Sequence, residues 1–284
     1  MANKRILVTG ANGYIGAHVV QAVLDCGCEA IACDVRFDRV PAEATQLEIN
    51  IFAPKANVYE QAMKPDVLIH LAWRNGFQHN ADSHMKDLPL HIQFLQNMID
   101  AGIPAISVMG SMHEVGYWEG AITAESPTNP QSMYGISKNA LRQAAELMVK
   151  GKNTRLCWLR GYYIFGDDDR SNSVLGKILV ADRNGQEWFP FTSGKNMYDF
   201  ISVKELARQI VAASVQDKYT GIINCCSGAP ISLSDMAQKF IAEQGLKIKL
   251  QYGAYPDRPY DSPGVWGDAS IIRKILAEQK EQGT

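Results

Sequence analysis

A glycine-rich turn near the N-terminus most constrains what this chain can fold into. Residues 4–9 have the composition of a short buried strand and residues 17–24 have the pattern of an apolar helix, and between them stand Gly10, Gly13 and Gly16. Glycine lets the backbone approach a pyrophosphate closely, and a helix N-terminus presents unpaired N–H groups to that anion. The turn therefore predicts a parallel α/β sheet with a dinucleotide at its edge.

Strand and helix patterns alternate along the chain after this turn. Such alternation is typical of a parallel sheet covered on both faces by helices. The fold class we predict is α/β, a Rossmann-type doubly wound parallel sheet with a smaller C-terminal α/β substrate lobe. Further strands are expected at 29–33, 46–50, 66–71, 104–109 and 154–159, and helices at 54–63, 88–101 and 134–149.

The character of the chain changes after Gly166, where a polar, loop-like run begins. The division we predict is a dinucleotide-binding Rossmann domain at 1–166 and a smaller substrate-binding lobe at 167–284. Segments around 196–226 are expected to pack back on the first domain. In this second part we expect helices at 202–215 and 232–244, a strand at 221–226 and an irregular, proline-rich stretch at 255–264.

A carboxylate stands at the end of the second predicted strand. Asp34 lies 18 residues after Gly16. At that place a carboxylate accepts hydrogen bonds from the ribose diol of NAD and repels the 2′-phosphate of NADP. Arg36 keeps NADP open as an alternative, because a guanidinium pairs well with phosphate. We expect NAD as the cofactor.

Composition and charge exclude several other classes of protein. The formal net charge is −2 with no basic block, so no nucleic-acid partner is expected. The six cysteines lack the paired spacing of a zinc site, so we expect buried thiols and no metal. The N-terminus does not resemble a secretory signal, and no apolar run is long enough to span a bilayer. We expect no membrane association and a cytoplasmic location.

A tyrosine and a lysine lie one helical turn apart in the middle of the chain. Tyr134 and Lys138 open a predicted helix, and residues four apart share a helix face. A neighbouring cation favours the phenolate and lowers a pKa that is about 10 in free tyrosine. Such a pair can exchange a proton with an alcohol or ketone. On its own, however, this spacing also occurs by chance on many helices.

Together these motifs give the chain a resemblance to a known family. The Thr9–Gly16 turn combined with Tyr134 and Lys138 resembles the short-chain dehydrogenase/reductase superfamily, and within it the extended NAD-dependent epimerase/dehydratase group that acts on nucleotide sugars. The resemblance implies that Tyr134 is the acid or base, that Lys138 lowers its pKa and binds the nicotinamide ribose, and that a serine after the fifth strand positions the substrate oxygen. Ser111 is that serine when the register is counted from the strand. Counting back from Val115 gives Met112, which cannot donate a hydrogen bond, so Ser111 is our choice.

The resemblance also implies the residues that bind cofactor and substrate. For the substrate it implies Trp73, His113, Tyr163 and Arg258, the last holding a diphosphate. The cofactor-binding set comprises Gly10, Asn12, Gly13, Tyr14, Ile15, Gly16, Asp34, Asn50, Ile51, Leu71, Ala72, Trp73 and Lys138.

Three residues depart from the family pattern and affect the choice of reaction. His91 replaces a common asparagine, and either packing or a proton relay would explain it. Tyr163 replaces an asparagine near the substrate phosphates. In place of the usual acidic pair of 4,6-dehydratases, His113 precedes Glu114, so half of the elimination apparatus is altered, although Glu114 could still act as a base.

The function that we expect is that of a nucleotide-sugar oxidoreductase, most specifically a 4-ketoreductase/dehydrogenase of a nucleotide-linked 6-deoxyhexose. A nucleotide-sugar 4-epimerase is the first alternative, followed by a 4,6-dehydratase and a reductase of small carbonyl compounds. A non-catalytic cofactor sensor would not need Ser111, Tyr134 and Lys138. The resemblance further suggests a homodimer built from the helices at 88–101 and 134–149.

Overall fold

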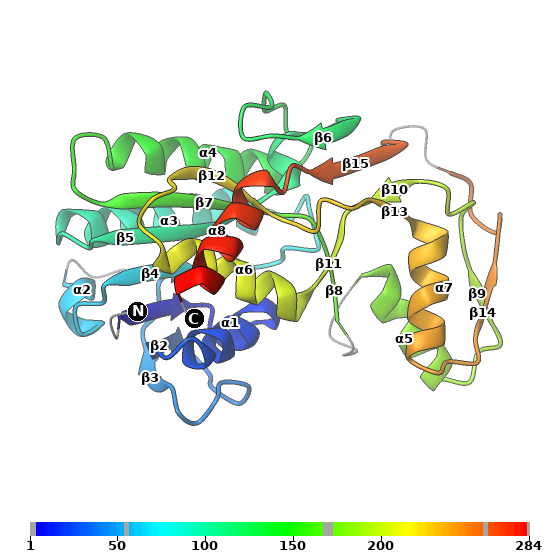
Figure 1. The fold of residues 1–284 in the computed structure, drawn as a ribbon, viewed down its shortest axis with the longest axis horizontal. Helices are drawn as coiled ribbons and strands as arrows, with labels where there is room; N and C mark the ends of the chain where they lie inside the picture. Colours follow the sequence, from blue (N-terminus) through cyan, green and yellow to red (C-terminus); the bar gives the residue numbers. More distant parts are fainter. Residues whose placement is uncertain (1–3, 54–56, 167–172, 258–260, 283–284) are drawn as a thin grey trace.

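The computed structural model describes residues 4–53, 57–166, 173–257 and 261–282. Within them a seven-stranded parallel sheet runs in the order β12-β7-β5-β4-β1-β2-β3 (Figure 1). The order reverses between β1 and β4, which is where a doubly wound sheet opens a crevice for ligands. The strands are β1 (Arg5–Thr9), β2 (Glu29–Asp34), β3 (Thr45–Glu48), β4 (Val67–His70), β5 (Ala105–Ser111), β7 (Arg155–Gly161) and β12 (Gly221–Cys225).

Helices cover both faces of this sheet, as the alternating pattern predicts. One face packs against α3 (Ser83–Asp100) and α4 (Met133–Met148), with the short α2 (Val58–Gln61) beside α3. The other packs against α1 (Tyr14–Asp25), α6 (Val203–Val215) and α8 (Ser270–Gln282). Because both faces are covered, β4 is buried along its whole length.

A smaller lobe lies at one end of the sheet, on the right in Figure 1. It consists of α5 (Val174–Arg183), α7 (Leu233–Glu243) and the paired strands β9 (Trp188–Pro190) and β14 (Lys249–Gln251), around an apolar core of its own. The segment expected to return to the first domain supplies α6 and β12. The exact division of the chain near residue 166 stays a prediction.

Short strands connect the lobe to the main body. A second sheet has the order β13-β10-β15-β6, and a further pair joins β8 to β11. At this junction the buried Asp199 carboxylate accepts hydrogen bonds from the N–H groups of Ser227 (2.8 Å), Gly228 (2.9 Å) and Gly267 (3.1 Å). The strands are β6 (Gly120–Ile122), β8 (Tyr163–Phe165), β10 (Met197–Tyr198), β11 (Phe200–Ser202), β13 (Ile231–Ser232) and β15 (Gly264–Gly267).

Helix α3 begins at Ser83, earlier than the start at residue 88 that the sequence suggested. Pro89 lies inside the helix, and proline ordinarily marks a first turn, which explains the late predicted start. Among the described residues, no helix combines the length and apolar character needed to span a bilayer.

Candidate active site

The β1–α1 turn accepts nothing larger than glycine at two positions. Gly10 has φ +69°, and a Cβ there would lie 2.7 Å from the backbone of Ala72. A Cβ on Gly16 would lie 2.0 Å from the carbonyl oxygen of Gly10. The turn closes with the Gly13 N–H donating to that same oxygen at 3.0 Å, and α1 follows with Tyr14 and Ile15 in its first turn. Backbone N–H groups at such a helix start form a ready site for a pyrophosphate.

Asp34 stands beside this turn, at the end of β2. Its Oδ2 accepts from the backbone N–H of Asn12 at 3.0 Å and its Oδ1 from Val35 N–H at 2.7 Å. The Asn12 side chain is occupied elsewhere, donating to Asp38 at 2.8 Å and accepting from the backbone N–H of Arg39 at 2.8 Å. Asp34 remains partly exposed, so a carboxylate is available next to the glycine turn, as recognition of a ribose diol requires.

The other predicted cofactor residues follow the neighbouring strands. Asn50 comes after β3 and accepts from Phe52 N–H at 3.0 Å, whereas Ile51 is buried in the core. Leu71 directly follows β4, and its N–H donates to Thr9 at 3.2 Å. All lie at the carboxyl edge of the sheet, which is the ligand edge of an open α/β fold.

Ser111, Tyr134 and Lys138 converge although they come from different elements. Ser111 ends β5, and its side chain shares a hydrogen bond with the partly exposed Tyr134. Helix α4 is positioned by its N-cap Ser132, whose oxygen accepts from Gly135 N–H at 3.1 Å. Lys138 lies one turn further along, buried, and its Nζ donates to the Met109 carbonyl at 2.7 Å.

The hydrogen bond between Ser111 and Tyr134 supports the choice of Ser111 over Met112, which stays a prediction. Met112 is 7% exposed and belongs to the apolar core, so it makes no polar contact with Tyr134. Residues 112–114 form the 3-10 turn η1 (Met112–Glu114), which supplies the extra residue between Ser111 and Val115.

Burial dominates the electrostatics of the pair on α4. It raises the pKa of Tyr134 to about 12, opposed by the hydrogen bond from Ser111 and reinforced by the charge of Glu114. It lowers the pKa of Lys138 to about 7, opposed by Glu114. The sequence argument expected Lys138 to lower the pKa of Tyr134. The net shift of the Tyr134 pKa is instead upward, because loss of hydration disfavours the phenolate.

Trp73 packs directly on Lys138. Its ring lies 3.8 Å from the lysine Nζ, in the geometry of a cation–π contact. The indole stacks on His91 at 4.5 Å between centroids, and its N–H donates to His84 Nδ1 at 3.1 Å. Trp73 meets Tyr134 edge-on at 6.0 Å. Its roles toward cofactor and substrate stay predictions, but its packing on Lys138 is direct.

Imidazoles surround Tyr134. His79 stacks on the phenol ring at 5.4 Å, and His113 lies edge-on at 6.0 Å. Burial lowers the pKa of His113 to about 4 and that of His91 to about 3. His91 hydrogen-bonds to the buried His70 at 3.0 Å, so the structure favours a packing role for it over a charged relay. Because these pKa values are lowered, the imidazoles surround Tyr134 without adding positive charge near pH 7.

His84 contacts Trp73, which was not predicted from the sequence. It and His91 are seven residues apart on α3 and therefore lie on one helix face. The spacing of seven residues could have indicated that His84 lies beside His91. It was not used because the helix was expected to begin at residue 88, after His84.

Of the remaining predicted substrate residues, Tyr163 belongs to the strands that join the smaller lobe to the main body. Tyr163 packs against Tyr198 at 4.3 Å and Phe200 at 5.7 Å, where β8 meets β11. Arg258 lies outside the described residues. In the part of the chain that the structure describes, no group of three or more His, Cys, Asp or Glu side chains is placed to hold a metal ion.

The sheet order, the glycine turn beside Asp34 and the tyrosine–lysine pair together define an enzyme of the Rossmann-type, dinucleotide-dependent class. The chain belongs to the NAD dependent epimerase/dehydratase family, whose sequence model matches residues 6–226.

Similar proteins narrow the range of reactions. The chain is 45% identical over 269 residues to dTDP-6-deoxy-L-talose 4-dehydrogenase (NAD(+)) of Aggregatibacter actinomycetemcomitans, an alignment that covers 92% of this chain and 98% of that protein. A UDP-glucose 4-epimerase of Azospirillum brasilense is 24% identical, over 97% of this chain and 87% of that protein.

Solved structures share the fold at lower identity. A UDP-N-acetylglucosamine 4-epimerase of Methanobrevibacter ruminantium, in complex with UDP-N-acetylmuramic acid, superposes with a TM-score of 0.84 at 20% identity, covering 97% of this chain and 92% of that one. The UDP-glucose 4-epimerase of Thermus thermophilus in complex with NAD gives 0.75 at 18% identity, with 97% and 93% covered. At this level of identity the likeness concerns the fold.

Proposed function

We propose that this protein is an NAD-dependent 4-dehydrogenase/4-ketoreductase of a nucleotide-linked 6-deoxyhexose, with a dTDP sugar as its substrate. The observation that carries the proposal is the 45% identity to a dTDP-6-deoxy-L-talose 4-dehydrogenase over nearly the full length of both chains. The convergence of Ser111, Tyr134 and Lys138 supports it with the groups that such a reaction needs.

The site supports a simple division of labour. Tyr134 takes the proton of the sugar hydroxyl on oxidation and returns it on reduction. Ser111, hydrogen-bonded to Tyr134, holds the same oxygen in place. The Lys138 ammonium, fixed by the Met109 carbonyl and the Trp73 ring, favours the phenolate. The β1–α1 turn and Asp34 would hold the cofactor, which would provide a hydride acceptor as NAD+ and a hydride donor as NADH for the carbon that bears this oxygen.

Elimination of water is disfavoured by the position of Glu114. Its side chain is fully buried and bonded to donors, so it is not available as the base that a 4,6-dehydratase requires. An epimerase would keep its cofactor through the catalytic cycle, so it would invert C4 without net formation of NADH.

The test is an assay with dTDP-linked and UDP-linked 6-deoxyhexoses and added NAD. We expect NADH to accumulate with the dTDP sugar, and Tyr134→Phe to bind NAD while losing turnover by roughly 10²–10⁴-fold. Protein that carries stoichiometric NAD and inverts C4 without net NADH formation would instead be an epimerase. NADH formation with neither sugar would overturn the proposal.

We further propose a cytoplasmic homodimer that uses α3 and α4. Apolar side chains are exposed on these adjacent helices at Met85 (44%), Met133 (44%), Ile136 (41%) and Leu147 (71%), which supports burial against a second copy. The six cysteines are unpaired, which supports a reducing compartment.

A further inference from the structure

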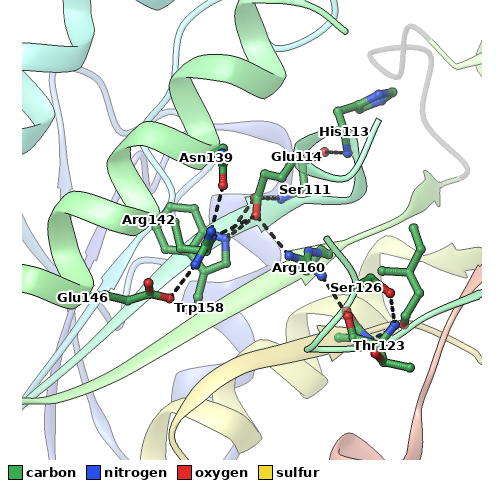
Figure 2. Close-up of polar contacts among 12 residues, drawn as sticks. Ser111, His113, Glu114, Thr123, Ser126, Asn139, Arg142, Glu146, Trp158 and Arg160 are labelled. Atoms are coloured by element: carbon green, nitrogen blue, oxygen red, sulfur yellow. Dashed lines mark hydrogen bonds and ion pairs between the residues drawn. The ribbon is translucent and has the colours of Figure 1, made fainter. Parts of the chain in front are cut away.

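Glu114 is a buried acidic residue next to the catalytic group. It ends η1, three residues after Ser111, and none of its side chain is exposed. Figure 2 shows the carboxylate directed between α4 and β7, whereas the neighbouring His113 points away from it. A buried charge at this place needs compensating partners.

Every partner of the Glu114 carboxylate is a hydrogen-bond donor or a cation. Oε1 accepts from the backbone N–H of Ser111 at 2.6 Å, and both oxygens lie 2.9 Å from the indole Nε1 of Trp158. Oε2 lies 3.5 Å from Nη2 of the equally buried Arg160. Burial raises the pKa of Glu114, and the charge of Arg160 and the hydrogen bonds from Ser111 and Trp158 oppose that shift. A protonated carboxyl would place a donor among donors, so the hydrogen-bond geometry fits the ionised form.

The same carboxylate links three elements around Ser111. Arg142 of α4 places its Nε 4.0 Å from Oε2, and also forms an ion pair with Glu146 at 2.7 Å. Arg160 of β7 donates to the Thr123 carbonyl at 3.2 Å. The end of β5 is therefore held between α4 and β7 through one buried anion (Figure 2).

The backbone before Ser111 is shaped to admit this contact. A Cβ on Gly110 would lie 2.1 Å from the Nε1 of Trp158 and 2.7 Å from the Oε1 of Glu114. Only glycine leaves room for the indole and carboxylate to meet beside the strand, so three residues of different elements depend on one another.

We propose that Glu114 is a positioning residue for the reaction proposed above. It fixes the backbone of Ser111 and places a buried negative charge two residues along β5 from the Met109 carbonyl that holds Lys138. It is not a catalytic residue, because it faces donors of the protein and has no exposed surface. The turnover measurement below rests on the proposed function, whereas the titration of Lys138 does not.

The charge acts in a defined direction. Lys138 is held at the Met109 carbonyl and Glu114 at the Ser111 N–H, two residues apart on β5. Burial lowers the pKa of Lys138, and the nearby carboxylate opposes that shift. Burial raises the pKa of Tyr134, and the carboxylate adds to that shift. The other titratable groups that interact electrostatically with Lys138 are His70 on β4 and His91 on α3. Both are held neutral by burial, so Glu114 is the anion of this group. Removing its charge lowers both pKa values, and the protonated forms are then lost at lower pH.

The experiment compares Glu114→Gln with Glu146→Gln. Both remove a carboxylate that pairs with Arg142, but Glu146 is 42% exposed and makes no contact with Ser111. The ¹³Cε resonance of Lys138, assigned with Lys138→Met, is titrated in each protein. We expect the Lys138 titration to move down by on the order of one pH unit in Glu114→Gln and to stay unchanged in Glu146→Gln.

Turnover provides the second readout. In Glu114→Gln the alkaline limb of carbonyl reduction should move to lower pH together with the Lys138 titration. Trp158→Phe removes one donor and leaves the Ser111 N–H and Arg160 on the carboxylate, so it should lower kcat without moving that limb. If Glu114→Gln does not fold, the kcat of Trp158→Phe decides, and a value equal to that of the wild type overturns the proposal.

An unchanged Lys138 titration in Glu114→Gln, or an equal shift in Trp158→Phe, overturns the proposal. The titration needs no substrate, so it remains decisive even if the assay with dTDP sugars fails.

Discussion

Lys138 occupies a position that is unfavourable for a charged side chain. It is 3% exposed, and the ammonium has the Met109 carbonyl and the face of Trp73 as its nearest partners. A carbonyl and an indole offset only part of the lost hydration, which is why the pKa falls to about 7. The fold therefore gives up stability at this residue in order to place a cation beside Tyr134.

Replacing this lysine should stabilise the protein in a pH-dependent way. Because the pKa of Lys138 is depressed on folding, the native state is penalised below pH 7 and the penalty fades as pH rises toward 10.5. We expect Lys138→Met to unfold at a higher temperature than the wild type at pH 6. Its advantage should shrink by about 2–3 kcal/mol between pH 6 and pH 9.

Thermal and urea unfolding at the two pH values measure this difference, and Lys150→Met, an exposed lysine just after α4, serves as the control. An advantage of Lys138→Met that is independent of pH would mean that Lys138 is not deprotonated on folding.

At the scale of elements, the β1–α1 turn shows how a local motif becomes a binding surface. The helix can begin where it does only because Gly16 passes against the carbonyl of Gly10. That contact directs the first N–H groups of α1 to the carboxyl edge of the sheet, next to Asp34. The spacing of the glycines is thus a packing requirement as well as a ligand requirement.

Gly16→Ala tests this requirement. Its Cβ would lie 2.0 Å from a backbone oxygen, so the turn must open. We expect NAD affinity measured by calorimetry to fall by roughly tenfold or more, about 1.4 kcal/mol. Gly76→Ala adds a Cβ that meets nothing within 4 Å and should bind NAD as the wild type does. Equal affinity of the two variants would contradict the role of the close approach.

The sequence predicts elements well where the signal is local. The seven sheet strands and most of the helices on them follow from short apolar runs and periodicity. The sequence does not predict strands such as β10 and β13, because a two-residue strand is defined by pairing with a partner far along the chain. The start of α3 was wrong because Pro89 carries a local signal that tertiary packing overrides.

For the site, the resemblance to the epimerase/dehydratase group, carried by the Thr9–Gly16 turn with Tyr134 and Lys138, was sufficient to select Ser111, Tyr134 and Lys138 as candidates. Their surroundings were not predictable in the same way. The contact of Trp73 with Lys138 joins the end of β4 to α4, and the pairing of Glu114 with Arg160 joins η1 to β7. Neither contact has a short-range signature in the sequence. The burial that raises the pKa of Tyr134 also depends on tertiary packing, so the upward shift could not be foreseen.

At the scale of the whole molecule, the most exposed of the large apolar residues on α3 and α4 is Leu147, at 71%. The smaller lobe has a core of its own between α5 and α7, although it also exposes apolar residues such as Val180 (38%) and Trp188 (50%). A two-fold symmetric homodimer would bury the surface of α3 and α4 on both subunits, because the two-fold axis repeats every contact.

A charge on this surface should separate the subunits. We expect Leu147→Glu to raise the dimer dissociation constant by roughly tenfold or more, because two carboxylates are placed in one apolar interface. Val180→Glu places the same charge at a 38% exposed apolar position on α5 and should leave assembly unchanged. Light scattering after gel filtration distinguishes them, and a wild-type monomer at high concentration would refute the proposed dimer.

The second sheet has a consequence for how the chain acquires its structure. It orders strands from four separate stretches of the chain, and β15 closes it by pairing with β6, just beyond the serine-bearing turn. Pairings between distant stretches form slowly, because the intervening loop must first be closed at an entropic cost. We therefore expect refolding to pass through a species whose parallel sheet is protected from hydrogen exchange while β6 and β15 still exchange freely. Such a species would bind dinucleotide before it could recognise a sugar.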